Sequence, residues 1–66
     1  MKSIIEIIGR IEYPLECGYR AFIKQQNGTM LFTSQVVDIR DNSKYGITIE
    51  TQNTIYKLTY AAENAA

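Results

Sequence analysis

The sequence contains no histidine and no tryptophan, and Cys17 is its single cysteine. Without histidine, the side chain that most often carries general acid–base catalysis is missing. One cysteine cannot form a disulfide within the chain, and without histidine it leaves no set of soft ligands for a metal. No phosphate-binding glycine motif is present either. We therefore predict a protein that is not an enzyme and that has no catalytic residues, no metal site and no cofactor.

The chain also lacks an excess of charge of either sign, because seven basic and seven acidic residues give a formal net charge of zero. A dedicated nucleic-acid-binding domain usually carries a basic face, and docking on an anionic membrane also needs basic residues. Glu6 and Arg10 interrupt the apolar start of the chain well before the about 20 residues that a spanning helix needs. We expect no targeting segment, no membrane contact and no preference for nucleic acid. The lone cysteine favours a reducing cytoplasm.

Residues that favour β-strands are spread along nearly the whole chain. They predict five strands, at residues 3–13, 19–26, 29–40, 44–51 and 54–60. The third strand is expected to bend near Thr33-Ser34. Five short strands with tight turns predict an all-β fold, a small and strongly bent five-stranded antiparallel sheet or SH3-like barrel. This single domain covers residues 1–60, and residues 61–66 are expected to form a flexible C-terminal tail.

The last two predicted strands form a hairpin with Gln52 and Asn53 at its tip. In this register the apolar residues of both strands fall on one face, and a shift by one residue would mix the faces. The residues assigned to the core side are Tyr45, Ile47, Ile49, Tyr56, Leu58 and Tyr60. A second hairpin is predicted at Asn27-Gly28, which favours a two-residue type I′ turn. That turn sets Ile23 against Phe32.

The second hairpin and the first strand leave large apolar residues on both faces of the sheet. In the first strand one face carries Ile5, Ile7, Ile11 and Tyr13. The apolar residues opposite the assigned core are Ile4, Ile8, Phe22, Leu31, Val36 and Ile55. A domain of this size has little material to cover them, and a contiguous apolar patch usually marks an interface. We therefore predict a homo-oligomer, or a module that docks on a larger protein, through these six residues.

Five tyrosines are the other unusual feature of the composition. Tyr13 and Tyr19 bracket the first loop, and with Arg20 and Tyr60 they are the candidate ligand-binding residues. Aromatic grooves on SH3-type barrels bind extended proline-rich peptides, and aromatic side chains beside cations stack on nucleic-acid bases. The alternative is that the tyrosines fill a small core and place their hydroxyls in water.

Two runs of the sequence resemble a pattern found in short uncharacterised bacterial and phage or prophage open reading frames. They are Thr33-Ser34-Gln35-Val36-Val37-Asp38-Ile39 and Thr51-Gln52-Asn53-Thr54-Ile55-Tyr56-Lys57-Leu58. The resemblance implies a mobile-element setting, in which small proteins without catalytic residues act as inhibitors. Such proteins block a host protein or sequester a small signalling molecule between subunits. We therefore predict an oligomeric, non-enzymatic binding protein of this kind, and the alternative is a small barrel that binds nucleic acid.

Overall fold

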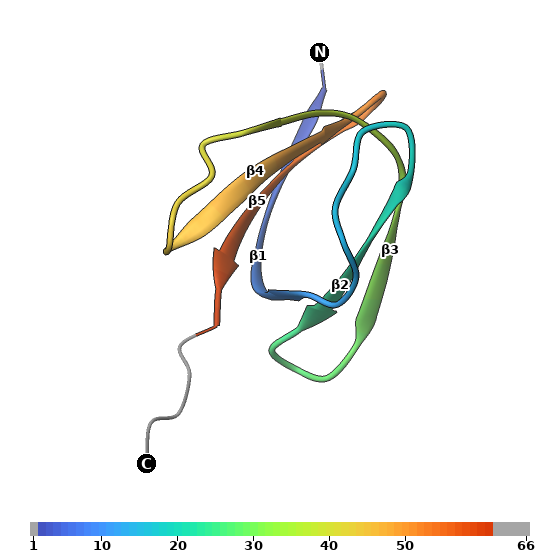
Figure 1. Ribbon diagram of the computed structural model, residues 1–66. Helices are drawn as coiled ribbons and strands as arrows, with labels where there is room; N and C mark the ends of the chain where they lie inside the picture. The colour runs from blue at the N-terminus through green and yellow to red at the C-terminus, as the bar shows by residue number, and fades with distance from the viewer. Residues whose placement is uncertain (1, 62–66) are drawn as a thin grey trace.

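The computed structural model describes residues 2–61, which form five strands and no helix. The strands are β1 (Ser3–Ile11), β2 (Arg20–Gln25), β3 (Met30–Arg40), β4 (Gly46–Thr51) and β5 (Thr54–Tyr60). They close into a barrel in sequence order (Figure 1), which confirms the predicted all-β fold and is consistent with an SH3-like small barrel. Within the described part of the chain no helix could cross a membrane. Residues 62–66 of the predicted tail lie outside the described residues.

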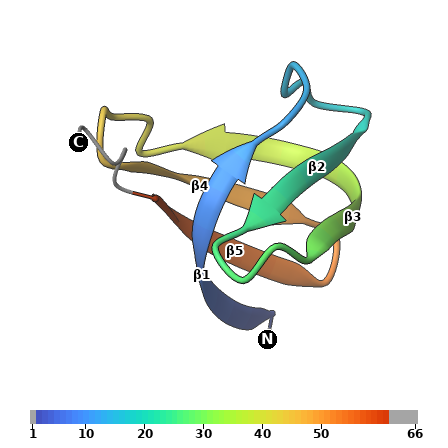
Figure 2. The ribbon, with the colours of Figure 1, turned by 90° about the horizontal axis from the view of Figure 1, so that it is seen from below.

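The barrel closes through a parallel pair, although its other neighbouring strands are antiparallel. Five strands joined by reversing connections alternate in direction, so β1 and β5 run the same way and can pair only in parallel. Their register extends from Ser3 opposite Thr54 to Gly9 opposite Tyr60. The ladder continues beyond β5, because the amide of Ala61 donates to the carbonyl of Gly9 at 2.9 Å. Figure 2 shows β1 and β2 crossing steeply over β4 and β5.

The register predicted for the last hairpin is confirmed, with pairs from Gly46 opposite Thr59 to Glu50 opposite Ile55. Gln52 and Asn53 lie at its tip, but neither has the positive φ that the usual two-residue turns require. The buried Thr51 compensates for this, because its hydroxyl accepts from the amide of Thr54 and donates to the carbonyl of the same residue. The pairing of the strands, together with this side chain, therefore determines the turn.

The connection between β2 and β3 differs from the prediction by one residue. Gly28 has a φ of 90°, whereas Asn27 has no positive φ, so the predicted type I′ turn is wrong. The loop has three residues instead of two. The amide of Gly28 donates to the carbonyl of Gln25 at 2.9 Å, and the amide of Gln25 donates to the carbonyl of Thr29 at 2.8 Å. This geometry fits a three-residue hairpin loop with a glycine at the bulge.

The longer loop shifts the pairing of β2 with β3 by one residue and thereby decides which side chains face each other. Ile23 lies opposite Leu31, and Phe22 lies opposite Phe32. Ile23 is buried and Leu31 packs against the core, so the two phenylalanines share the outer face. The longer loop therefore exchanges Leu31 and Phe32 between the two faces, while Phe22 stays on the outer face.

β3 bends near the predicted position, because its register with β2 shifts at Thr33-Ser34. The hydroxyl of Thr33 accepts from the amide of Ala21 at 2.9 Å and donates to the carbonyl of Ser34 at 2.7 Å. The side chain thus supplies bonds that the bulge removes from the ladder. A second register shift, near Val37, lies within the pairing with β4, between Val36 opposite Thr51 and Asp38 opposite Glu50. The two bulges let the first half of β3 pair with β2 and its second half pair with β4.

The buried core draws on four of the five strands. Its apolar members are Ala21, Ile23, Val36, Ile47, Ile49 and Leu58. The last hairpin contributes three of these as predicted, and Tyr56 and Tyr60 pack against them. The assignment of Tyr45 to the core side is wrong. Tyr45 is exposed, because it precedes the first residue of β4, where strand alternation no longer applies.

Gly9 lies where β1 is in contact with both β2 and β5. A Cβ atom at this position would overlap the carbonyl oxygen of Lys24 and lie 2.9 Å from the Cα of Gln25. The backbone of β2 approaches β1 so closely that only glycine fits.

We expect Gly9→Ala to lower the free energy of unfolding by about 3 kcal/mol or more, because the backbone of β2 would have to move. Gly18→Ala is the control. Gly18 has a φ of 91° but no atom within 4 Å of a Cβ, so the left-handed conformation alone should cost about 1 kcal/mol. Urea denaturation measures both variants, and equal losses would contradict the role of Gly9 in closing the barrel.

Candidate functional site

The six residues predicted as an interface do not form one surface. Val36 is only 1% exposed and belongs to the core, and Leu31 packs against the core. Their assignment to the outer face is therefore wrong. The bulge at Thr33-Ser34 inverts the alternation along β3 and turns Val36 inward. The three-residue loop turns Leu31 inward in the same way.

Three of the remaining four residues lie together on the outer face of β1 and β5. Ile4 is directly opposite Ile55 in the parallel ladder. The next pair on this face of the sheet is Glu6 with Lys57, and the pair after it contains Ile8. Ile4 is 59% exposed. The fourth residue, Phe22, lies on the outer face of β2 and belongs to a different surface.

The first half of β1 has a backbone edge without a strand partner. β5 pairs with seven consecutive residues of β1, whereas β2 pairs with only the last three. In a parallel ladder alternate residues turn their N–H and C=O groups to opposite edges. The carbonyl of Gly9 accepts a hydrogen bond from the amide of Ala61, which follows β5. The backbone N–H and C=O groups of the odd-numbered residues of β1 therefore point toward β5. The backbone groups of Ile4 and Glu6 therefore point to the free edge.

A shallow hollow lies where this free edge meets the β2–β3 loop. The amide of Gln26 donates to the carbonyl of Ile8 at 2.9 Å, which is the last bond between the two elements among residues 2–61. Beyond it the strands separate. The hollow is lined by Glu6, Ile7, Ile8, Gln25, Gln26 and Asn27. It occupies the side of β1 on which a further strand would add.

The free half of β1 is apolar on both faces. Ile5 lies on the inner side of the strand, opposite Tyr56, and is nevertheless 40% exposed. Ile4 is exposed on the outer side of the same strand. Together, Ile4, Ile5, Ile8, Ile55 and the unpaired edge are called the β1 surface below.

A second surface is formed by three aromatic rings that contact one another edge to face. The ring of Phe22 lies 5.2 Å from that of Tyr13 on one side and 5.2 Å from that of Phe32 on the other, with interplanar angles of 77° and 82°. Tyr13 and Phe32 are 59% and 57% exposed. These three residues are called the aromatic ladder below.

The four predicted ligand-binding residues are not brought together. Tyr13 belongs to the aromatic ladder, and Tyr19 and Arg20 are also exposed. Tyr60 packs against the core instead. Sequence reasoning missed Phe32, which the correct turn length would have placed opposite Phe22.

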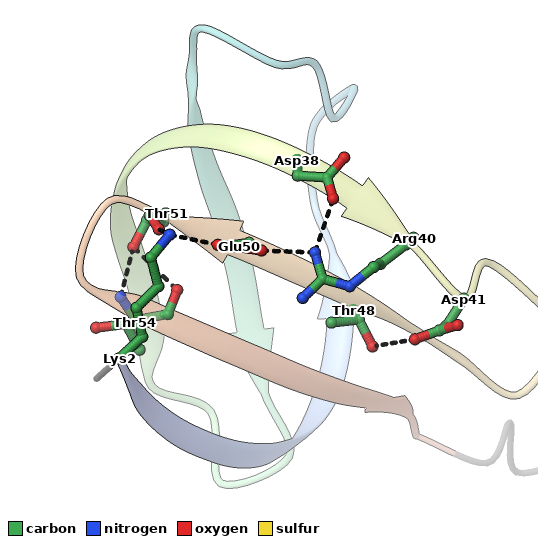
Figure 3. A network of polar contacts seen from close by, with 8 residues as sticks. All are labelled: Lys2, Asp38, Arg40, Asp41, Thr48, Glu50, Thr51 and Thr54. Atoms are coloured by element: carbon green, nitrogen blue, oxygen red, sulfur yellow. Dashed lines mark hydrogen bonds and ion pairs between the residues drawn. The ribbon is translucent and has the colours of Figure 1, made fainter.

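A network of ion pairs connects the start of β1 with β3 and β4 (Figure 3). Glu50 of β4 bonds to Lys2, which precedes β1, and to Arg40 of β3 at 2.6 Å. Arg40 also bonds to Asp38 at 2.7 Å. Nearby, the hydroxyl of Thr48 donates to Asp41 at 3.2 Å. Lys2 thereby links the beginning of β1 to β4, which lies on the other side of β5.

The network keeps its carboxylate charged. The hydrogen bond from Lys2, and next the one from Arg40, holds the pKa of Glu50 below its ordinary value. The same contacts raise the pKa of Arg40, with the bond to Glu50 as the largest cause. A carboxylate paired on both sides is suited to a structural role, since a general acid needs a raised pKa near the working pH.

We expect Glu50→Gln to lower the melting temperature at neutral pH, because it removes the charge shared by two ion pairs. The folded pKa of Glu50 lies below the ordinary value of 4.5, so its stabilising effect is complete above that value and is lost as the pH falls through the folded pKa. The difference from the wild type should therefore stay constant above about pH 4.5 and narrow as the pH falls below it. Thermal melts followed by circular dichroism measure it.

Glu16→Gln is the matched control, because Glu16 is exposed and forms no ion pair with another residue in the described range. It should leave the melting temperature unchanged at every pH. A difference for Glu50→Gln that stays constant with pH would contradict the role of the charge.

The chain matches no protein-family model, no curated protein and no solved structure with which it was compared. Function must therefore be inferred from the surfaces of the barrel. The β1 surface and the aromatic ladder lie on different strands, so each can be assessed separately.

Proposed function

We propose that this chain is a non-enzymatic interaction protein that works as a homo-oligomer, and that its copies associate through the β1 surface. The observation that supports this is the unpaired edge of β1, with exposed isoleucines on both faces of one strand. An apolar strand with a free edge is a template for pairing with another strand. A domain of this size has few elements of its own with which to cover such an edge.

A second copy is the occupant that fits the edge best. The edge offers alternating donors and acceptors, so it is complementary to itself in an antiparallel pair about a two-fold axis, the commonest symmetry of soluble homo-oligomers. The net charge of zero means that two copies do not repel each other at long range. The exposed isoleucines of each copy would cover those of the other.

Electrostatics also favours one register of this pair. A two-fold axis at Glu6 would set two carboxylates directly opposite each other, which is destabilising. An axis at Ile5 instead sets Ile4 opposite Glu6 of the other copy and brings the two Ile5 side chains together. We therefore propose the register centred on Ile5, which also covers the half-exposed inner side of β1.

The proposed setting is the cytoplasm, where the exposed and unpaired Cys17 stays reduced. The resemblance to short phage and prophage proteins supports a role as an inhibitor or accessory protein. In that role the assembled protein would block a larger host protein or sequester a small ligand between its subunits.

Glu6→Pro tests the association. The N–H of Glu6 points to the free edge, so proline removes a donor there and leaves the ladder with β5 intact. We expect the wild type to sediment above its monomer mass of 7.5 kDa at micromolar concentration, and Glu6→Pro to sediment as a folded monomer. Glu6→Gln keeps the N–H and should associate like the wild type.

Ile4→Lys provides a second route to the monomer, because it changes an exposed side chain without altering the backbone. A wild type that sediments as a monomer would contradict the proposal. So would folded Glu6→Pro and Ile4→Lys variants that associate as strongly as the wild type. Circular dichroism confirms folding in each case.

A further inference from the structure

The aromatic ladder lies in a basic region of a neutral protein. Ala21 and Ile23 point into the core, so Arg20, Phe22 and Lys24 alternate with them on the outer face of β2. The neighbouring strands add Arg10 opposite Lys24 on one side and Met30 opposite Lys24 on the other. One strand thus presents a cation, an aromatic ring and a second cation in a row.

Two of these cations are free to meet a ligand. Arg10 is bonded to Glu12 at 2.7 Å, but Arg20 and Lys24 form no ion pair with any carboxylate in residues 2–61. Glu12 and Glu16 are the carboxylates of the adjoining loop. By contrast, the acidic network of β3 and β4 is neutralised by its own cations.

A shallow hollow lies beside Arg10 and Lys24 at the end of this row. Its lining also includes Gln25 and Gln26, together with Gly9, Gly28 and Ala61. Amides and cations of this kind hydrogen-bond to base edges and to phosphate oxygens. The surface therefore combines rings for stacking with donors for a charged backbone.

We propose that this face binds single-stranded nucleic acid, with bases stacked on the aromatic ladder and phosphates bound by Arg20 and Lys24. Stacking needs an unpaired base with an accessible face, which a single strand supplies and a duplex does not. A proline-rich peptide would instead need a groove between aromatic side chains. Here neighbouring rings are in direct contact at 5.2 Å and leave no groove between them. The neutral net charge predicts weak binding that depends on this face alone.

Fluorescence anisotropy tests the proposal with labelled oligothymidylate and oligouridylate of about 12 nucleotides. We expect at least one of them to bind, and the comparison distinguishes DNA from RNA as the source. We expect a plot of the logarithm of the association constant against the logarithm of the salt concentration to have a slope of about −1.4, because two cations are free. For Lys24→Gln, which leaves one of them, the slope should be about −0.7. Phe32→Ala should weaken binding at least about fivefold.

Matched controls distinguish this face from the rest of the molecule. Tyr45 is 71% exposed and lies on the β3–β4 connection, and Lys57 lies on the outer face of β5. Tyr45→Ala and Lys57→Gln should therefore leave binding unchanged. Phe32 is largely exposed, so its replacement should preserve the fold, as circular dichroism can verify. Glu6→Pro should also bind, because the proposed face does not depend on association through β1.

Four results would overturn the proposal. The first is that neither oligonucleotide binds at about 50 mM salt, and the second is that the control variants lose as much affinity as Phe32→Ala and Lys24→Gln. The third is that these two substitutions leave the affinity unchanged, and the fourth is that a proline-rich peptide binds whereas neither oligonucleotide does. The last result would identify the ladder as a peptide site.

Discussion

The parallel pairing of β1 with β5 is the constraint on which the rest of this barrel depends. Because β1 bonds to β5 along its first seven residues and to β2 along its last three, it changes neighbours at Gly9, where only glycine fits. β2 is too short to follow β1 further. The free edge at Ile4 and Glu6 is therefore a direct consequence of how the barrel closes. Lys2 and Glu50 then fix the otherwise one-sided strand at its beginning.

The barrel separates its charges, although their sum is zero. On β3 and β4 the carboxylates are held by Lys2 and Arg40 in a compact network. On the outer face of β2 two cations flank an aromatic ring and have no carboxylate partner among the described residues. Net charge describes the long-range behaviour of a protein, whereas a ligand of a few nucleotides meets only the local arrangement. A neutral composition is therefore compatible with one basic face.

Because the β1 surface and the aromatic ladder lie on different strands, association through one would leave the other accessible. Two copies joined at β1 would present two aromatic ladders on one particle. Linked weak sites bind a long ligand more tightly than either site alone, through a raised effective concentration. Self-association and ligand binding would then be complementary properties of one small domain, since a single barrel of this size offers little area for a tight site.

The sequence alone determined the five strands, the register of the last hairpin and the core positions of Ile47, Ile49 and Leu58. These features depend on local pairing with a period of two, so a short stretch contains all the information they need. The tertiary structure decided the rest. One extra loop residue and one bulge turned Leu31 and Val36 inward. The sequence predicted the bend near Thr33-Ser34 but not these changes of face, because a shift of the register by one residue depends on how the whole sheet bends. Barrel closure, which joins the two ends of the chain, decided which edge stays free, and the three-residue loop decided that Phe22 and Phe32 lie together.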